Sequence, residues 1–393
     1  MWSKPDNPEI PREPSRVEFA NTLRGLAAFL VMVSHYLAFY GPEREQIAAM
    51  IQAPILTLEQ QPIPAYSRLP SAIPGFSLPA FSVALFFLIS GFVIPFSTQR
   101  LNGPGFCVNR LFRILPTYMA GFTFSLLLLY AGRRYFSRDW PYAGAEVFIH
   151  YFPGLRDVLW SRHIDFIVWT LEIEMKFYLL CALLIGGLRR CALKVFWAPV
   201  ILFLSAQGLG HMMPSWERHA PALYRLAVTY YTASQYILFM FIGAIFHYMH
   251  RGRMIPAQAV PGIGALFGLF CLQWATGPGA ASRVVAWSYG VALLTFTFAY
   301  KVPGLFRSNR VFDFLANISY PLYVIHGVAG FVALRLLADR GIPPAVALML
   351  VTGLCLIVSW LFHLLVERPS QQLGKKLGRA LSGSSRSPAP TSP

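Results

Sequence analysis

The chain has 393 residues, of which 55% are hydrophobic and only 13% are charged, a composition that excludes an ordinary soluble globular protein. The formal net charge of +16 would suit a nucleic-acid-binding protein if the chain were soluble. In so apolar a chain, basic residues that flank membrane helices explain the charge, so we expect no nucleic-acid partner.

Residues 1–18 are polar, with prolines at regular spacing, and predict a disordered cytoplasmic N-terminus. Ten apolar segments of membrane-spanning length follow and predict an all-α polytopic membrane protein, one bundle of about ten helices in a single domain over 19–369. The predicted segments are 19–40, 79–97, 111–131, 166–187, 195–212, 233–249, 258–276, 284–300, 318–337 and 345–366. The tail, 370–393, is rich in Ser, Pro, Gly, Lys and Arg and predicts disorder on the cytoplasmic side.

The distribution of basic residues predicts the orientation of the bundle. With a cytoplasmic N-terminus, the cytoplasmic segments hold 18 Lys and Arg residues and the external loops hold 11. This bias favours two cytoplasmic termini. Five arginines in the loop 132–165 run against the rule, but this loop is long and also acidic. The five cysteines are scattered without metal-ligand spacing, so we expect packing residues and no metal site.

The first segment carries two polar side chains, Arg24 and His35, inside an apolar run. Ionisable groups in a membrane helix are costly and therefore suggest a functional site. Eleven positions of an α-helix turn through three full turns plus about 20° and rise about 16 Å, so both side chains lie on one face. His35 is a candidate general base, and a histidine that merely bonds a neighbouring helix is the structural alternative.

The third segment opens with Arg110 and Arg113, which share a helix face at the predicted cytoplasmic surface. Two guanidiniums there form a plausible phosphate clamp, although ordinary positive flanking explains them as well. The second segment closes with the stretch Phe87-Leu88-Ile89-Ser90-Gly91-Phe92-Val93-Ile94, which taken alone is a helix-packing motif.

The fourth segment contains Glu172, Glu174 and Lys176. Glu172 and Lys176 are four residues apart in the favourable order for an ion pair, so we expect them to pair. Glu174 then lacks a local partner and is the better candidate to face a polar cavity, unless it forms a buried pair with an arginine. In the ninth segment, Ser319, Tyr323 and His326 lie on neighbouring faces and are candidates to line a pocket or to bond between helices.

Together these motifs resemble the acyltransferase family 3 membrane proteins, which O-acylate bacterial surface glycans, Nod factors and some antibiotics. The matching motifs are R-x10-H from Arg24 to His35, FFLISGFVI, the R-x-x-R of Arg110 and Arg113 followed by Pro116 and Tyr118, WTLEIEMKFY, ISYPLYVIH and the final ERP. They occur in family order between residues 19 and 369. Thr170 stands where the family commonly has Ser, a mild departure.

The resemblance implies an acyl-CoA donor, acetyl-CoA by family habit, and a hydroxyl acceptor on a glycan or small molecule. It implies that His35 and Glu174 are catalytic and that Arg24, Arg110 and Arg113 bind the donor. We further expect Tyr323 and His326 to contact substrate. The protein would lie in the bacterial inner membrane, in contact with membrane lipid.

Two other interpretations fit the same sequence. A transporter or flippase of lipid-linked sugars would also have about ten helices with internal charges. A catalytically dead relative that serves as a scaffold is the third, and the intact pair of Arg24 and His35 argues against it.

Overall fold

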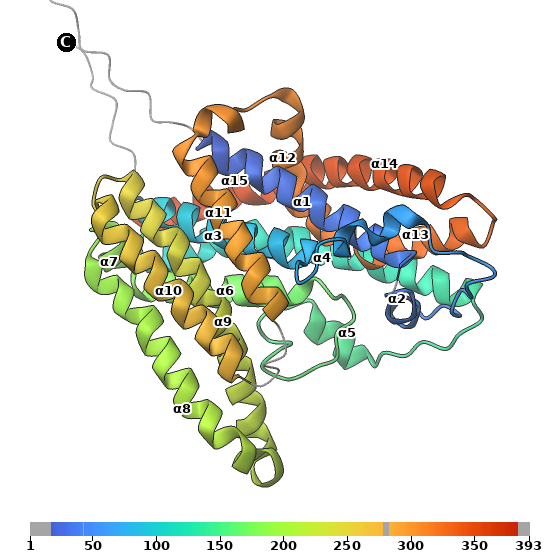
Figure 1. Ribbon diagram of the computed structural model, residues 1–393, viewed down its shortest axis with the longest axis horizontal. Coiled ribbons are helices and arrows are strands. Elements are labelled where there is room, and N and C mark those ends of the chain that lie inside the picture. The colour runs from blue at the N-terminus through green and yellow to red at the C-terminus, as the bar shows by residue number, and fades with distance from the viewer. Residues whose placement is uncertain (1–16, 42, 278–282, 384–393) are drawn as a thin grey trace, which may run out of the picture.

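The computed structural model describes residues 17–41, 43–277 and 283–383, and within these ranges it contains helices and no strand (Figure 1). The predicted all-α fold is therefore confirmed. The expected disorder of residues 1–16 and 384–393 concerns parts of the chain outside the described residues.

Each of the ten predicted segments coincides with a helix or a helix pair. The long helices are α1 (Glu18–Phe39), α3 (Leu78–Thr98), α4 (Gly103–Tyr135), α6 (Val168–Leu183), α8 (Trp197–His219), α9 (Pro221–His250), α10 (Pro256–Thr276), α11 (Arg283–Lys301), α12 (Arg310–Ile325), α13 (Val328–Ala338) and α14 (Pro344–Phe362). The shorter elements are α2 (Arg44–Met50), η1 (Ala65–Ser71), α5 (Gly144–His150), α7 (Ile185–Arg189), η2 (Leu193–Phe196), η3 (Pro303–Phe306), η4 (His363–Glu367) and α15 (Arg368–Leu381).

Seven stretches of the described chain are long and apolar enough to cross a membrane. An eighth is the pair of α12 and α13, which bends by 74° at its break. Helices α6 and α11 are not among them, and α6 has only 16 residues, three of them charged. The apolar helices make this a polytopic membrane protein, whereas the count of about ten spans stays a prediction.

Two hydrophobic clusters hold the bundle together. One joins the first half of α1 to α3, α6, α8, α9, α10 and α11. The other joins the second half of α1 to α4, α12, α13, α14 and the loops at that end. Figure 1 shows the hairpin of α8 and α9 on one side of the molecule and α13 and α14 on the other. Helix α1 thus contributes to both clusters, with Arg24 in the stretch that joins the first and His35 in the stretch that joins the second.

The tail begins as a helix, which corrects the expectation that residues from 370 onward are disordered. Residues 370–381 form most of α15, and Gly374 and Gly378 are buried against α4. Glycine and serine suggest disorder by composition, but here the missing Cβ atoms allow two helix backbones to approach closely. A polar composition therefore concealed a helix that packs through its glycines.

The crossing of α3 and α9 provides a test of this close packing. A Cβ atom on Gly91 would overlap the carbonyl oxygen of Met240 and lie 2.8 Å from its carbonyl carbon. Since backbone atoms cannot yield as a side chain can, we expect Gly91→Ala to lower the free energy of unfolding by about 1–3 kcal/mol. Thermal unfolding of the purified protein in detergent measures the change.

Gly264→Ala in α10 is the matched control, because nothing lies within 4 Å of its Cβ position. Alanine has the higher helix propensity, by about 1 kcal/mol, so this variant should be neutral or slightly stabilised. Equal stability of the two variants would contradict a tight crossing at Gly91.

Candidate functional site

A cavity of about 890 Å³ opens between α1, α3, α4, α6, α9, α12, η4 and α15. It lies at the end of the bundle where α1 and α4 begin and where α3, α9 and α14 end. This volume is at the upper end of the roughly 300–1,000 Å³ that small-molecule sites occupy. The cavity is therefore large enough for an extended ligand.

The described lining of the cavity is rich in cationic side chains. The lysines and arginines that line it are Arg24, Arg100, Arg113, Arg251, Lys375 and Arg379. Its carboxylates are Glu174 and Glu367, and the second already pairs with His363, Nδ1 to Oε2 at 2.7 Å. Because a concave wall of one charge sign concentrates its field, this cavity favours an anionic ligand.

Arg24 projects into this cavity and is oriented by the residues around it. Its Nη2 donates to the side-chain oxygen of Asn21 at 2.8 Å and to the carbonyl oxygen of Ala316 at 3.3 Å. The second contact reaches across from α1 to α12. Arg24 is thus held at the junction of two helices, with its guanidinium at the cavity wall.

The two arginines of α4 take different positions. Arg113 lines the cavity, but Arg110 is 5% exposed and lies behind the wall, with its guanidinium bonded to Ser97. Its Cζ also lies 5.4 Å from the ring centroids of Phe106 and Tyr178. The prediction that both lie at the surface is wrong for Arg110, because its guanidinium packs against Ser97 of α3 and Tyr178 of α6. Of these two arginines, Arg113 is the one whose side chain can contact a ligand in the cavity.

Glu174 faces the cavity and accepts two hydrogen bonds there. Its Oε1 accepts from the Ser90 hydroxyl at 3.1 Å and from the Tyr178 hydroxyl at 2.7 Å. These bonds stabilise the Glu174 carboxylate within the bundle. Ser90, which the sequence suggested only as a packing residue, also lines the cavity. The sequence offered no signal for this pairing, because α3 and α6 meet only in the fold.

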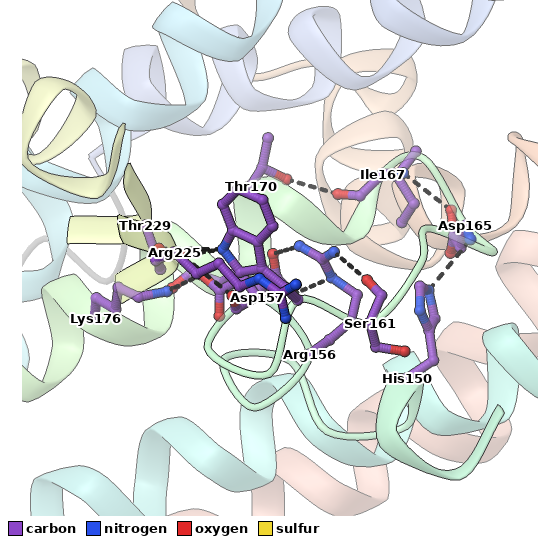
Figure 2. Close-up of polar contacts among 12 residues, drawn as sticks. His150, Arg156, Asp157, Ser161, Asp165, Ile167, Thr170, Lys176, Arg225 and Thr229 are labelled. Carbon is purple, nitrogen blue, oxygen red and sulfur yellow. Dashed lines mark hydrogen bonds and ion pairs between the residues drawn. The ribbon is translucent and has the colours of Figure 1, made fainter. Parts of the chain in front are cut away.

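The expected ion pair between Glu172 and Lys176 is wrong. Glu172 instead receives Arg156 in a bidentate pair, Nε to Oε1 and Nη2 to Oε2, both at 2.6 Å. Lys176 pairs with Asp157 (Figure 2). Two adjacent loop residues of opposite charge therefore replace the local pair, because the loop 151–167 folds back over the start of α6.

A buried histidine at the end of α5, His150, contacts a buried aspartate of the same loop, Asp165. The backbone N–H of Asp165 donates to His150 Nε2 at 3.2 Å, and Oδ1 of Asp165 accepts from the backbone of Ile167. Figure 2 shows His150 beside Asp165. Burial raises the pKa of Asp165 to about 7 and lowers the pKa of His150 to about 3. Burial thus disfavours the charged form of both groups, and Asp165 orders the entry into α6 through its bond to Ile167.

His35 and His326 form a hydrogen-bonded pair. Nδ1 of His35 lies 2.9 Å from Nε2 of His326, and Nδ1 of His326 lies 3.0 Å from the carbonyl oxygen of Leu322. A carbonyl only accepts, so in the neutral pair His326 Nδ1 carries its hydrogen and His326 Nε2 accepts from His35 Nδ1. This leaves Nε2 of His35 with a free lone pair, the form that a base or a nucleophile needs.

The histidine pair lies behind the inner wall of the cavity. Thr170 and Tyr323 line the cavity and share a hydrogen bond of 2.7 Å between their hydroxyls. The Tyr323 ring centroid lies 5.7 Å from that of His326, whereas neither His35 nor His326 lines the cavity. Tyr323 and Ser319 therefore line the cavity, whereas His326 takes the other expected role and bonds between helices, to His35 of α1. Contact of Tyr323 or His326 with substrate stays a prediction.

Several cationic residues of the cavity were missed in the sequence. By sequence alone, four of them indicate only the topology of the bundle or a polar tail: Arg100, Arg251, Lys375 and Arg379. Their common signal was position, since all lie beyond the ends of predicted apolar segments, namely 79–97, 233–249 and 345–366. That signal identifies the membrane side, but it does not say which of these side chains turn inward.

Comparison with known families agrees with the motifs. Residues 17–364, nearly the whole chain, match a family model described as "Acyltransferase domain", that of acyltransferase 3. The matched range begins directly before α1 and ends within η4, so it excludes α15. A search of curated proteins and a search of solved structures each returned no match.

The ion pair of Arg156 and Glu172 should contribute strongly to the stability of the fold, because it holds the loop 151–167 against α6. Its side chains are 6% and 2% exposed, so Arg156→Met would leave a buried carboxylate without its partner. We expect a loss of about 3–5 kcal/mol in the free energy of unfolding. The double variant Arg156→Met, Glu172→Met should recover most of this loss, as measured by thermal unfolding in detergent.

Arg162→Ala is the control, because its pair with Glu146 is largely exposed and exposed pairs contribute about 0.2–1 kcal/mol. An equally small loss in the free energy of unfolding for Arg156→Met would mean that the buried pair stabilises the protein no more than an exposed pair does.

Proposed function

The chain belongs to the acyltransferase 3 family and is an acyltransferase, and from this premise we propose that it moves an acyl group from acyl-CoA to a hydroxyl group. The acceptor is a glycan or a small molecule, and the acyl group is acetyl. The family match favours the enzyme over a flippase that moves lipid-linked sugars without acylating them.

The observation that carries the proposal is a cationic cavity that ends next to a histidine pair. Acyl-CoA bears its phosphates at one end of a long arm and its thioester at the other. The lining arginines suit the phosphates, and Arg113 and Arg24 are the side chains that we propose for them. Along α1, Arg24 and His35 are separated by about 16 Å, a span that the pantetheine arm can bridge.

His35 carries the chemistry in this proposal. The C–S bond of the thioester breaks and a C–O ester bond forms, while the hydroxyl proton passes through His35 Nε2 to the departing thiolate of CoA. His35 can also accept the acyl group first and pass it to the hydroxyl in a second step. His326 holds His35 in the required tautomer in either case.

The inner wall separates the cavity from this chemistry. The thioester reaches His35 when the contact between Thr170 and Tyr323 opens. His35 is itself partly exposed and packs against Phe166 of the loop 151–167, with ring centroids 4.8 Å apart. We propose that the acceptor hydroxyl arrives from the side of this loop. Glu174, fixed by Ser90 and Tyr178, orients the acceptor or balances a lining arginine.

We place this integral membrane protein in the bacterial inner membrane, with both termini and the cavity mouth on the cytoplasmic side. The bias of Lys and Arg toward those segments supports the orientation. Acyl-CoA is soluble in the cytoplasm, so this side is where a CoA-binding mouth would need to open.

The central test is His35→Ala. Removing a general base lowers the rate by roughly 10²–10⁴-fold, and loss of an acyl-accepting nucleophile is at least as severe. Transfer of radiolabelled acetyl by the purified protein, together with CoA release, measures the activity. A His35→Ala protein that folds like wild type and keeps full transfer would refute the proposal, as would movement of a substrate without any acylation.

His326 offers a second, finer test as a positioning residue. Glutamine at 326 places an amide oxygen where Nε2 stood and can still accept from His35 Nδ1, whereas alanine cannot. We expect His326→Ala to lose activity by about tenfold or more relative to His326→Gln. Equal activity of the two variants, at equal thermal stability, would show that the bond to His35 does not matter.

A further inference from the structure

Helix α15 lies outside the matched family region, yet it forms part of the cavity. The match ends at residue 364, and α15 begins at Arg368. Lys375 and Arg379 of α15 line the cavity together with Arg113 of α4. The matched range therefore stops before Lys375 and Arg379, although both line the same cavity as the matched residues.

The packing of α15 against α4 holds it firmly in place. A Cβ atom on Gly378 would lie 2.7 Å from the carbonyl oxygen of Gly105, and one on Gly374 would lie 2.5 Å from Cβ of Phe112. At the far end, the Asn102 side chain donates to the carbonyl oxygen of Leu381 at 2.9 Å. Because the backbones touch at Gly378 and side chains of α4 hold both flanks of this point, α15 is docked in one orientation.

That orientation turns one pair of cations toward the cavity. Lys375 and Arg379 are four residues apart, so they share a face of α15. Both are exposed to solvent, which places them at the rim, whereas Arg113 is half-buried and lies deeper. Lys376 is also exposed but does not line the cavity, because it lies on a different face of the helix.

We propose that α15 completes the donor site and that Lys375 and Arg379 bind the 3′-phosphate of CoA, an inference that rests on the proposed function. The pantetheine arm joins CoA at its pyrophosphate, so that group must lie deeper, near Arg113. The ribose 3′-phosphate is then the outermost anion, and the rim cations of α15 face it. Lysine and arginine together suit a phosphate monoester, as point charge and as planar fork.

The test compares two ligands that differ only in this phosphate. Equilibrium binding of CoA and of 3′-dephospho-CoA is measured by calorimetry on the full-length protein in detergent. The double variant Lys375→Ala, Arg379→Ala should bind CoA at least tenfold more weakly than wild type, while its affinity for dephospho-CoA stays unchanged. In wild type, CoA should bind more tightly than dephospho-CoA by the same factor.

Lys376→Ala is the matched control, since it removes one positive charge from the same helix without touching the cavity. The inference is overturned if this control weakens CoA as much as the double variant does, or if the double variant weakens both ligands equally or neither. If the double variant loses bound phosphatidylglycerol while its affinity for CoA is unchanged, the inference is also overturned, because the rim cations then bind lipid headgroups. Wild type that binds neither ligand and transfers no acetyl group would instead reject the proposed function itself.

Discussion

The close packing of α1 along α12 and α13 is the contact on which the site depends. A Cβ atom on Gly25 would lie 2.7 Å from the backbone nitrogen of Ala316, so the two backbones touch at this point. At one end of the interface Arg24 bonds the carbonyl of Ala316, and at the other His35 bonds His326. One helix contact therefore aligns the cation and the base, because each is held by the partner helix as well as by α1.

The break between α12 and α13 gives His326 its place. The two helices bend by 74° where His326 and Gly327 link them. His326 bonds back to the carbonyl of Leu322, so its ring is anchored to the end of α12 while its other nitrogen faces α1. Irregular backbone at membrane depth is tolerated where it is buried in protein, which is the situation of this link.

The carboxylates of α6 are each held by specific polar partners. Glu172 pairs with Arg156 of the loop 151–167, and Glu174 accepts from a hydroxyl of α3 and from one in its own next turn. A carboxylate within such a bundle is tolerated only with partners of this kind. The loop 151–167 is consequently held against α6, and Phe166 near its end packs against His35. Structural charges and the site thus share one helix, with Glu172 serving the fold and Glu174 facing the cavity.

The sequence alone determined the class of the protein, the positions of its helical segments and the family. It also identified Arg24, His35, Arg113, Glu174 and Tyr323 as polar residues that needed an explanation. Helical period and hydropathy are local properties, so they survive without the fold. The tertiary structure decided which partner each group has: Arg156 for Glu172, His326 for His35, a buried place for Arg110 and an ordered α15 beside the cavity. Those outcomes depend on which helix faces meet. In a bundle of apolar helices, close contact between small residues determines which faces pack together. The sequence of a single segment does not contain this information, because it depends on the partner helix as well.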